Sequence, residues 1–133
     1  MKIVLSLLVL TFATASYSFD AAKYFKKTCA ACHKIGGGDT PKLGPDLAGV
    51  SKRRKLDWIV KFIKYPEGMI AGDEDEKGYE KADPTAKAVF ELYKPAMMAE
   101  IEITKVQVVA LLKYIDSLKK QPKGKITKKL ILK

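Results

Sequence analysis

The chain has 133 residues, of which 25 are Lys or Arg and 15 are Asp or Glu, so its formal net charge is +10. This length suits one small domain. The basic balance favours acidic partners or anionic lipid surfaces. It would also suit nucleic acid, but the sequence has no nucleic-acid-binding motif and its N-terminus indicates export, so we predict no nucleic-acid partner.

Residues 1–18 have the layout of a secretory signal peptide. Lys2 precedes an apolar run over residues 3–15 that ends in small residues, as a signal peptide does before its cleavage site. A membrane-spanning helix needs about 20 apolar residues, which this run does not reach. We therefore predict cleavage near residue 18 and a periplasmic location. Retention of the segment as an uncleaved anchor stays open.

The segment Cys29-Ala30-Ala31-Cys32-His33 holds both cysteines and the only histidine of the chain. A disulfide and a thioredoxin-type redox pair also use two nearby cysteines, but the flanking patterns are helical rather than βαβ. Zinc usually takes four ligands from separated pairs, whereas this segment offers only three ligands, all close together, so a zinc site is not favoured. Cys-x-x-Cys-His is the attachment signature of covalent haem: each thiol forms a thioether with one haem vinyl group, and the imidazole binds iron. The segment therefore predicts one haem c, with His33 as an iron ligand.

Helical patterns lie on both sides of this motif. Asp20 is placed to cap a helix that runs through Phe25 toward the cysteine pair. Residues 56–65 have apolar side chains on one helical face, and Pro66 is expected to stop that helix.

The second half of the chain contains two clear helix starts. Asp83-Pro84 places proline at the first helical position. Residues 104–107 form a capping box, and apolar residues at helical spacing follow as far as Leu118. The sequence predicts an all-α fold of four or five helices with long loops and no sheet.

Three other segments resemble binding motifs in composition alone. Glycines 36–38 lack the Walker spacing and its Lys-Ser/Thr ending, so we interpret them as a turn. The acidic run 72–83 lacks the ligand order of an EF-hand, so we predict a solvated loop. Residues 119–133 hold seven lysines, and two interpretations stay open: docking to an acidic enzyme or an anionic membrane, or a solvated tail.

Further motifs place the haem segment in a known setting. Phe25 lies four positions before Cys29, residues 44–47 match Gly-Pro-x-Leu, and Tyr114-Ile115 is an aromatic-aliphatic pair in the last helix. With these motifs, residues 20–118 resemble a class I c-type cytochrome. The resemblance implies helices wrapped around one covalently attached haem. It also implies a cytochrome c domain over 19–120, between the signal peptide (1–18) and a basic C-terminal tail (121–133).

The resemblance implies roles for single residues around the haem. The carbonyl of Pro45 would accept a hydrogen bond from His33 and so orient this iron ligand. Arg53, Arg54 and Trp58 fall where members of the family often meet the haem propionates. Lysines near the thioether edge would steer acidic partners; these are Lys26, Lys27 and Lys34.

The sixth iron ligand cannot be a second histidine of the same chain. Met98 lies six residues before Thr104 and sixteen before Tyr114, a spacing similar to that of small bacterial members of the family. We therefore predict His33 and Met98 as the two metal ligands. Met97, Met69 or no methionine at all stay open, because the proline that usually follows the axial methionine is replaced by Ala99.

These inferences predict a one-electron carrier between a membrane or periplasmic donor and a respiratory acceptor enzyme, and not an enzyme itself. The thioether ligand would raise the reduction potential, because it favours reduced iron. Two alternatives stay open: a haem protein with an open sixth site that acts as a sensor or resembles a peroxidase, and a detached cytochrome subunit of a respiratory complex. The expected partners are redox proteins with acidic docking surfaces; an anionic membrane surface bound through the tail stays open as a further partner.

Overall fold

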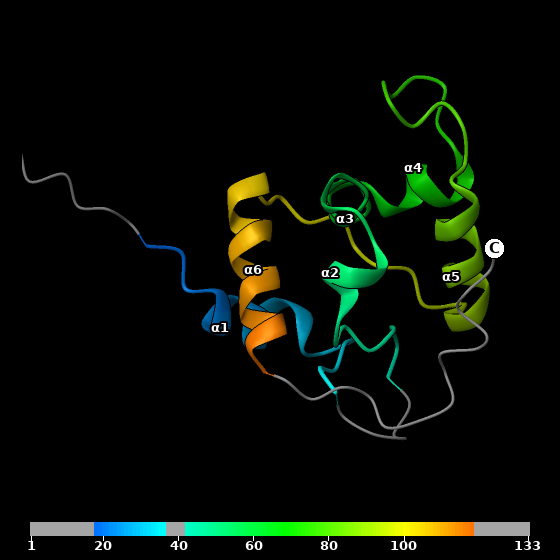
Figure 1. The fold of residues 1–133 in the computed structure, drawn as a ribbon. Coiled ribbons are helices and arrows are strands. Elements are labelled where there is room, and N and C mark those ends of the chain that lie inside the picture. The colour runs from blue at the N-terminus through cyan, green and yellow to red at the C-terminus, as the bar shows by residue number, and fades with distance from the viewer. Residues whose placement is uncertain (1–17, 37–41, 119–133) are drawn as a thin grey trace, which may run out of the picture.

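The computed structural model describes residues 18–36 and 42–118, and these residues form an all-α fold (Figure 1). The elements in chain order are α1 (Ala21–Tyr24), the π-helical turn η1 (Phe25–Cys29), α2 (Val50–Arg53), α3 (Leu56–Lys64), α4 (Pro66–Ala71), α5 (Pro84–Tyr93) and α6 (Lys105–Ser117). The described part of the chain contains no strand, as the sequence predicts. The predicted signal peptide, apart from Ser18, and the basic tail lie outside the described residues.

The helix starts predicted from the sequence are confirmed. The Asp20 carboxylate accepts a hydrogen bond from the Lys23 backbone N–H (2.9 Å) at the start of α1. Asp83 does the same for Ala86 (2.8 Å) at the start of α5, with proline at the first helical position. Thr104 begins α6 with both bonds of the capping box in place. Each cap satisfies backbone donors that have no partner inside the helix.

Two short helices, α2 and α4, are missing from the sequence-based prediction. Pro66 ends α3 as expected, but it also occupies the first position of α4, where a missing N–H costs nothing. Helices of four and six residues are too short for an apolar periodicity to reveal. Within residues 18–36 and 42–118, no helix has both the length and the apolar character needed to cross a membrane.

The core consists of two apolar clusters that share Trp58. The first joins η1, α3 and α6, and its buried members are Phe25, Ile59, Ile103, Val108, Leu111 and Ile115. The second joins α4 and α5, and its buried members are Met69, Ile70 and Ala86. Trp58 packs against both clusters. In Figure 1 the pair α1–α6 and the pair α4–α5 accordingly stand on opposite sides of α2 and α3.

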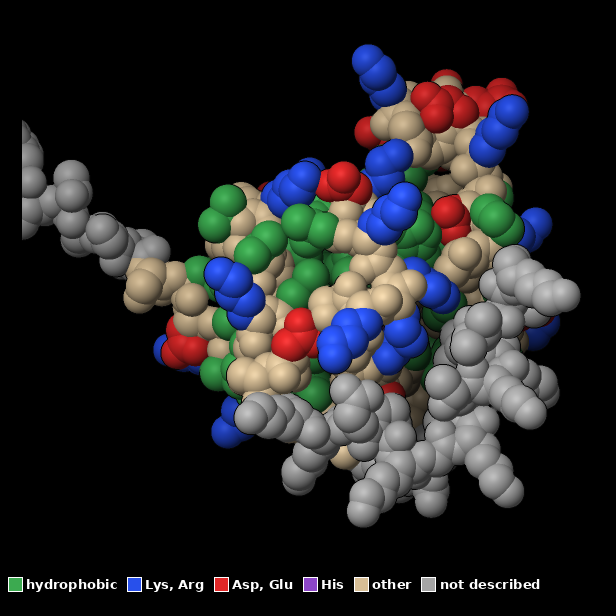
Figure 2. All heavy atoms as spheres, viewed as in Figure 1, with side chains coloured by type: hydrophobic (Ala, Val, Ile, Leu, Met, Phe, Trp, Pro, Cys, Tyr) green, Lys and Arg blue, Asp and Glu red, His purple; other side chains and the backbone are tan. Residues whose placement is uncertain are grey.

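The acidic segment 72–83 forms an exposed loop between α4 and α5. Its backbone closes on itself through the Asp73 N–H and the Tyr79 carbonyl (2.7 Å). Lys61 of α3 donates to the Gly78 carbonyl (3.0 Å), and the Tyr65 hydroxyl donates to the Asp73 carboxylate. Figure 2 shows acidic side chains gathered at this end of the molecule. No group of three or more His, Cys, Asp or Glu side chains among the described residues is arranged to hold a metal ion.

Candidate haem site

The attachment segment begins where α1 widens into the π-helical turn η1. The Ala30 N–H donates to the Phe25 carbonyl (2.9 Å), a wide-turn bond that is frequent at functional sites. The N–H groups of Cys32 and His33 then both donate to the Cys29 carbonyl (3.2 and 2.9 Å). One compact turn therefore carries both thiols and the imidazole. The thiols are free: Cys32 is exposed, and Cys29 is half-buried, which raises the pKa of its thiol.

Residues 42–47 run alongside this turn, and we call them the proximal strap. The strap is tied to the turn by hydrogen bonds at both of its ends. The bonds run from Lys42 Nζ to the carbonyls of Ala30 (3.0 Å) and Ala31 (3.2 Å), from Gly44 N–H to Cys32 (2.9 Å) and from Leu47 N–H to Lys34 (2.8 Å). The strap therefore forms a fixed surface against which the imidazole of the turn can pack.

His33 is oriented by this strap. Its Nδ1 lies 2.8 Å from the Pro45 carbonyl oxygen, which can only accept, so Nδ1 carries the proton and Nε2 keeps its lone pair. Burial lowers the pKa of His33 and outweighs the Pro45 carbonyl, which acts in the opposite direction. The imidazole is therefore neutral, as an iron ligand must be. Gly44 lies directly against the ring, because a Cβ on Gly44 would stand 2.5 Å from His33 Cε1.

A polar cluster behind the strap fixes its path. The Asp46 carboxylate accepts from the N–H groups of Gly36 (2.9 Å) and Ala48 (2.7 Å). The Arg53 guanidinium of α2 donates to the backbone carbonyls of Asp46 (3.0 Å) and Ala48. The resemblance implies that Arg53 meets the propionates, whereas its bonds in the structure go to the strap. A propionate contact of Arg53 stays a prediction.

Trp58 carries a buried donor that has no acceptor in the described part of the chain. Its ring stacks on Phe62 with centroids 5.1 Å apart, and the Arg54 guanidinium lies 5.4 Å above the ring centroid. The indole Nε1 is buried and has no hydrogen-bond partner within residues 18–36 and 42–118. A buried donor without a partner costs about 1–3 kcal/mol. A haem carboxylate would satisfy it, with Arg54 adjacent, so this part of the site fits the propionate end of a haem.

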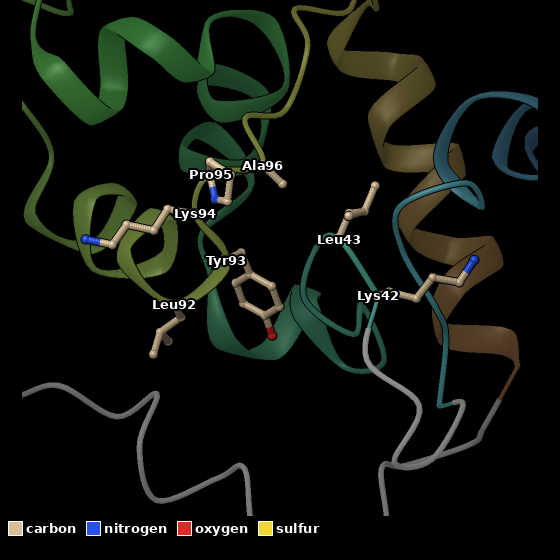
Figure 3. A pocket seen from close by; sticks show the side chains of 7 residues that line it. All are labelled: Lys42, Leu43, Leu92, Tyr93, Lys94, Pro95 and Ala96. Carbon is tan, nitrogen blue, oxygen red and sulfur yellow. The ribbon is translucent and has the colours of Figure 1, made fainter.

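A cleft of about 550 Å³ opens beside the strap. Lys42 and Leu43 of the strap line one side of the cleft (Figure 3). Residues 92–96, which form the end of α5 and the segment directly after it, line the other side. Leu43 and Leu92 are 62% and 48% exposed, so apolar side chains line this opening. Large exposed apolar side chains that gather around a cleft mark a surface that binds an apolar group. The body of a porphyrin has this character.

The three methionines of the described chain differ in their surroundings. Met69 is 5% exposed and belongs to the core cluster of α4 and α5. Met97 is 45% exposed, whereas Met98 is half-buried in the segment that joins α5 to α6. Met98 therefore differs from Met97 in its burial. The assignment of Met98 as the sixth iron ligand stays a prediction.

Several site residues escape sequence reasoning. Lys42 donates to the carbonyls of Ala30 and Ala31, and Tyr93 lines the cleft opposite the strap. These arrangements join segments that are far apart in the chain, and no local pattern marks them. Asp46 did carry a signal, because an Asp after Gly-Pro often accepts bonds from nearby backbone N–H groups.

The chain is similar to known proteins in sequence and in structure. Residues 20–119 match the family model described as Cytochrome c. A solved structure, the cytochrome c domain of pp3183 protein from Pseudomonas putida, shares 31% sequence identity with a TM-score of 0.57. The match covers 72% of this chain and 84% of that chain. No curated protein matches the chain.

Proposed function

Because this chain belongs to the cytochrome c family, we propose that it is an exported carrier that passes single electrons from a membrane or periplasmic donor to a respiratory acceptor enzyme. Members of the family bind covalently attached haem c and carry electrons, and Cys29 and Cys32 have the spacing for this attachment. The nature of the electron donor, the nature of the electron acceptor and the export of the chain are proposals.

The main support for this proposal is the hydrogen bond of 2.8 Å between His33 Nδ1 and the Pro45 carbonyl oxygen. When bound, haem c supplies an iron that alternates between two oxidation states. Cys29 and Cys32 would hold the group in place, and His33 would present Nε2 to the iron. Pro45 and Gly44 prevent this imidazole from turning. A fixed ligand suits electron transfer, because little has to rearrange when the charge changes.

We assign the sixth coordination position to Met98. Its partial burial and its place before α6 support this assignment, and its exposed neighbour Met97 provides a matched control. Met98→Ala should give a high-spin or lysine-ligated haem, whereas Met97→Ala should keep the wild-type spectrum. A wild-type spectrum for Met98→Ala would dismiss Met98 as the ligand. The reverse pattern would assign Met97.

The first test is the absorption spectrum of the matured protein, oxidised and reduced, with and without CO. An electron carrier should be low-spin, should show the weak far-red band of a methionine–iron bond, and should not bind CO. A high-spin spectrum that shifts with CO would instead support a sensor or a peroxidase-like protein. Stable co-purification with a membrane oxidase or reductase would support the subunit alternative.

We propose that docking to acidic partners uses the basic surface and the tail. Lys26 and Lys27 of η1 are exposed next to the attachment turn, which supports this part of the proposal. Deletion of residues 121–133 should slow electron transfer to the partner mainly at low salt, because exposed charges are screened at high salt. A chain of full length with the tail lysines changed to Gln is the matched control, and it should behave as the deletion does. An unchanged rate at low salt would remove the support for docking through the tail.

The proposed export has its own measurement. The mass of haem-containing protein from the periplasmic fraction should correspond to a chain that begins near residue 19. A mature protein that retains residues 1–18 would indicate an N-terminal anchor instead.

A further inference from the structure

The helix that leads into the attachment motif ends inside the motif, so its last carbonyl groups need donors from elsewhere. η1 ends at Cys29, whose carbonyl accepts from the N–H groups of Cys32 and His33 (3.2 and 2.9 Å). The next carbonyls belong to Ala30 and Ala31, the two residues between the thiols. The last carbonyls of a helix have no partner inside the helix. A donor for these two groups therefore has to come from another segment of the chain.

Lys42 of the proximal strap is this donor. Its Nζ lies 3.0 Å from the Ala30 carbonyl oxygen and 3.2 Å from that of Ala31. In Figure 3 its side chain extends away from α5, which stands on the other side of the cleft. An ammonium group has three N–H donors, so it can bond both carbonyls at once, and its positive charge suits the negative end of a helix dipole. Lys42 therefore caps the attachment turn from twelve and eleven positions away in the chain.

The same cap contributes to the contact between the strap and the imidazole. Pro45 has no N–H, so no backbone donor can tie the strap at the residue whose carbonyl bonds to His33. On the N-terminal side of Pro45, the strap is held by the Gly44 N–H bond to the Cys32 carbonyl (2.9 Å) and by Lys42. A hydrogen bond from an ionised donor is stronger than one between neutral groups. The tie through Lys42 is made by a side chain, so a substitution can remove it without changing the backbone bonds.

We propose that Lys42 is a positioning residue for His33: its ammonium caps the attachment turn, and this cap keeps the Pro45 carbonyl on the imidazole. The inference rests on the proposed function, since it gives His33 the role of an iron ligand. Lys42 acts through the strap and touches neither the imidazole nor the iron. Without the ammonium, the strap opens more often, and the ring is then less firmly held in one plane.

The test measures how well the strap protects the imidazole. His33 is the only histidine of the chain, so labelling histidine with ¹⁵N gives one Nδ1–H signal in the reduced holoprotein. Lys42→Leu removes the ammonium, whereas Lys42→Arg keeps a positive charge and several N–H donors. Lys23→Leu is the matched control, because it removes the same charge from α1. The Lys23 side chain is exposed and has no hydrogen bond or ion pair among the described residues.

The exchange of the Nδ1 proton with water should be about threefold to tenfold faster in Lys42→Leu than in the wild type, because local opening of the strap exposes this proton. Lys42→Arg and Lys23→Leu should both exchange at about the wild-type rate. The backbone amides of α6 report unfolding of the whole domain, and their exchange should not change with the Nδ1 proton.

Three outcomes would overturn the inference: a wild-type rate in Lys42→Leu, an equal acceleration in Lys23→Leu, or an equal acceleration of the α6 amides. A wild-type chain that carries no haem would instead overturn the proposed function.

A second readout reports the orientation of the ring itself. In low-spin ferric haem the unpaired electron is distributed according to the plane of the axial imidazole, so the proton NMR shifts of the haem methyl groups depend on that plane. The pattern of these shifts should change in Lys42→Leu and return to the wild-type pattern in Lys42→Arg. An unchanged pattern in Lys42→Leu would overturn the inference, even for a variant with lower thermal stability.

The wild-type holoprotein decides the question if Lys42→Leu does not fold. With lysine labelled with ¹⁵N, the Lys42 ammonium protons should exchange slowly enough to be observed at low temperature, because two carbonyls hold them. The absence of such a signal would overturn the inference.

Discussion

Substitution of Gly44 by Ala tests the fit between the strap and the imidazole. The backbone of Gly44 is not in the left-handed region, so alanine is compatible with its conformation. The new Cβ would stand 2.5 Å from Cε1, 2.9 Å from Nδ1 and 3.2 Å from Nε2 of His33. Carbon atoms in favourable contact are about 3.5–4.0 Å apart. The ring and the strap must therefore separate by roughly 1 Å.

Neither side of this contact can move freely. A displaced His33 ring stretches the bond to the Pro45 carbonyl (2.8 Å), and a displaced strap stretches the bond from Gly44 N–H to Cys32 (2.9 Å). Overpacking of this kind costs about 1–3 kcal/mol. For a domain of this size, 1 kcal/mol corresponds to about 4–8 °C in Tm, so a cost of about 2 kcal/mol lowers Tm by roughly 8–16 °C.

Gly68→Ala is the matched control for this prediction. A Cβ on Gly68 would collide just as closely with the ring of Tyr65, far from the attachment turn in the chain. Thermal unfolding should show a loss of stability in both variants, whereas the haem spectrum and potential should change only in Gly44→Ala. A Gly44→Ala protein with wild-type stability, spectrum and potential would refute the reasoning.

The remaining predictions concern a donor, a helix cap and a loop. Trp58→Phe keeps an aromatic ring but removes the buried N–H, so the holoprotein should lose about 1–3 kcal/mol in denaturant unfolding; full stability would mean that haem leaves this donor unused. Thr104→Ala should cost about 0.5–2 kcal/mol in the same assay without any spectral change, and a spectral change would contradict a purely structural cap. The hydroxyl of Tyr65 donates to Asp73, which raises the pKa of Tyr65 to about 12 and lowers that of Asp73. On the alkaline side, the stabilisation from this bond is complete below the usual tyrosine pKa of 10.0 and is lost as pH rises toward 12. On the acid side, the stabilisation is lost as pH falls below the usual Asp pKa of 3.8. Between these limits, amide exchange in the loop 72–83, corrected for intrinsic rates, should be slower in the wild type than in Tyr65→Phe. Equal rates in the two proteins would contradict a stabilising role for the hydrogen bond between Tyr65 and Asp73.

The features that could be predicted from the sequence depend on residues close together in the chain. The Asp20, Asp83 and Thr104 caps each join groups three positions apart, so their residue types are sufficient to predict them. The same holds for the attachment turn, in which the thiols and the imidazole lie within five consecutive residues. The bond between His33 and Pro45 spans twelve positions, and only the family motif made it predictable.

The amino-acid sequence by itself determined which chemistry this protein can perform, because covalent haem needs two thiols and an imidazole at one fixed local spacing. The tertiary structure alone decided how the remaining polar groups are used. It directs Arg53 to the strap, leaves Trp58 Nε1 without an acceptor among the residues that the structure describes, and brings Tyr93 near Asp46. These contacts join segments that meet only when α3 and α5 pack on the rest of the core. Side-chain burial and long-range distances decide them, and neither is encoded in a local pattern.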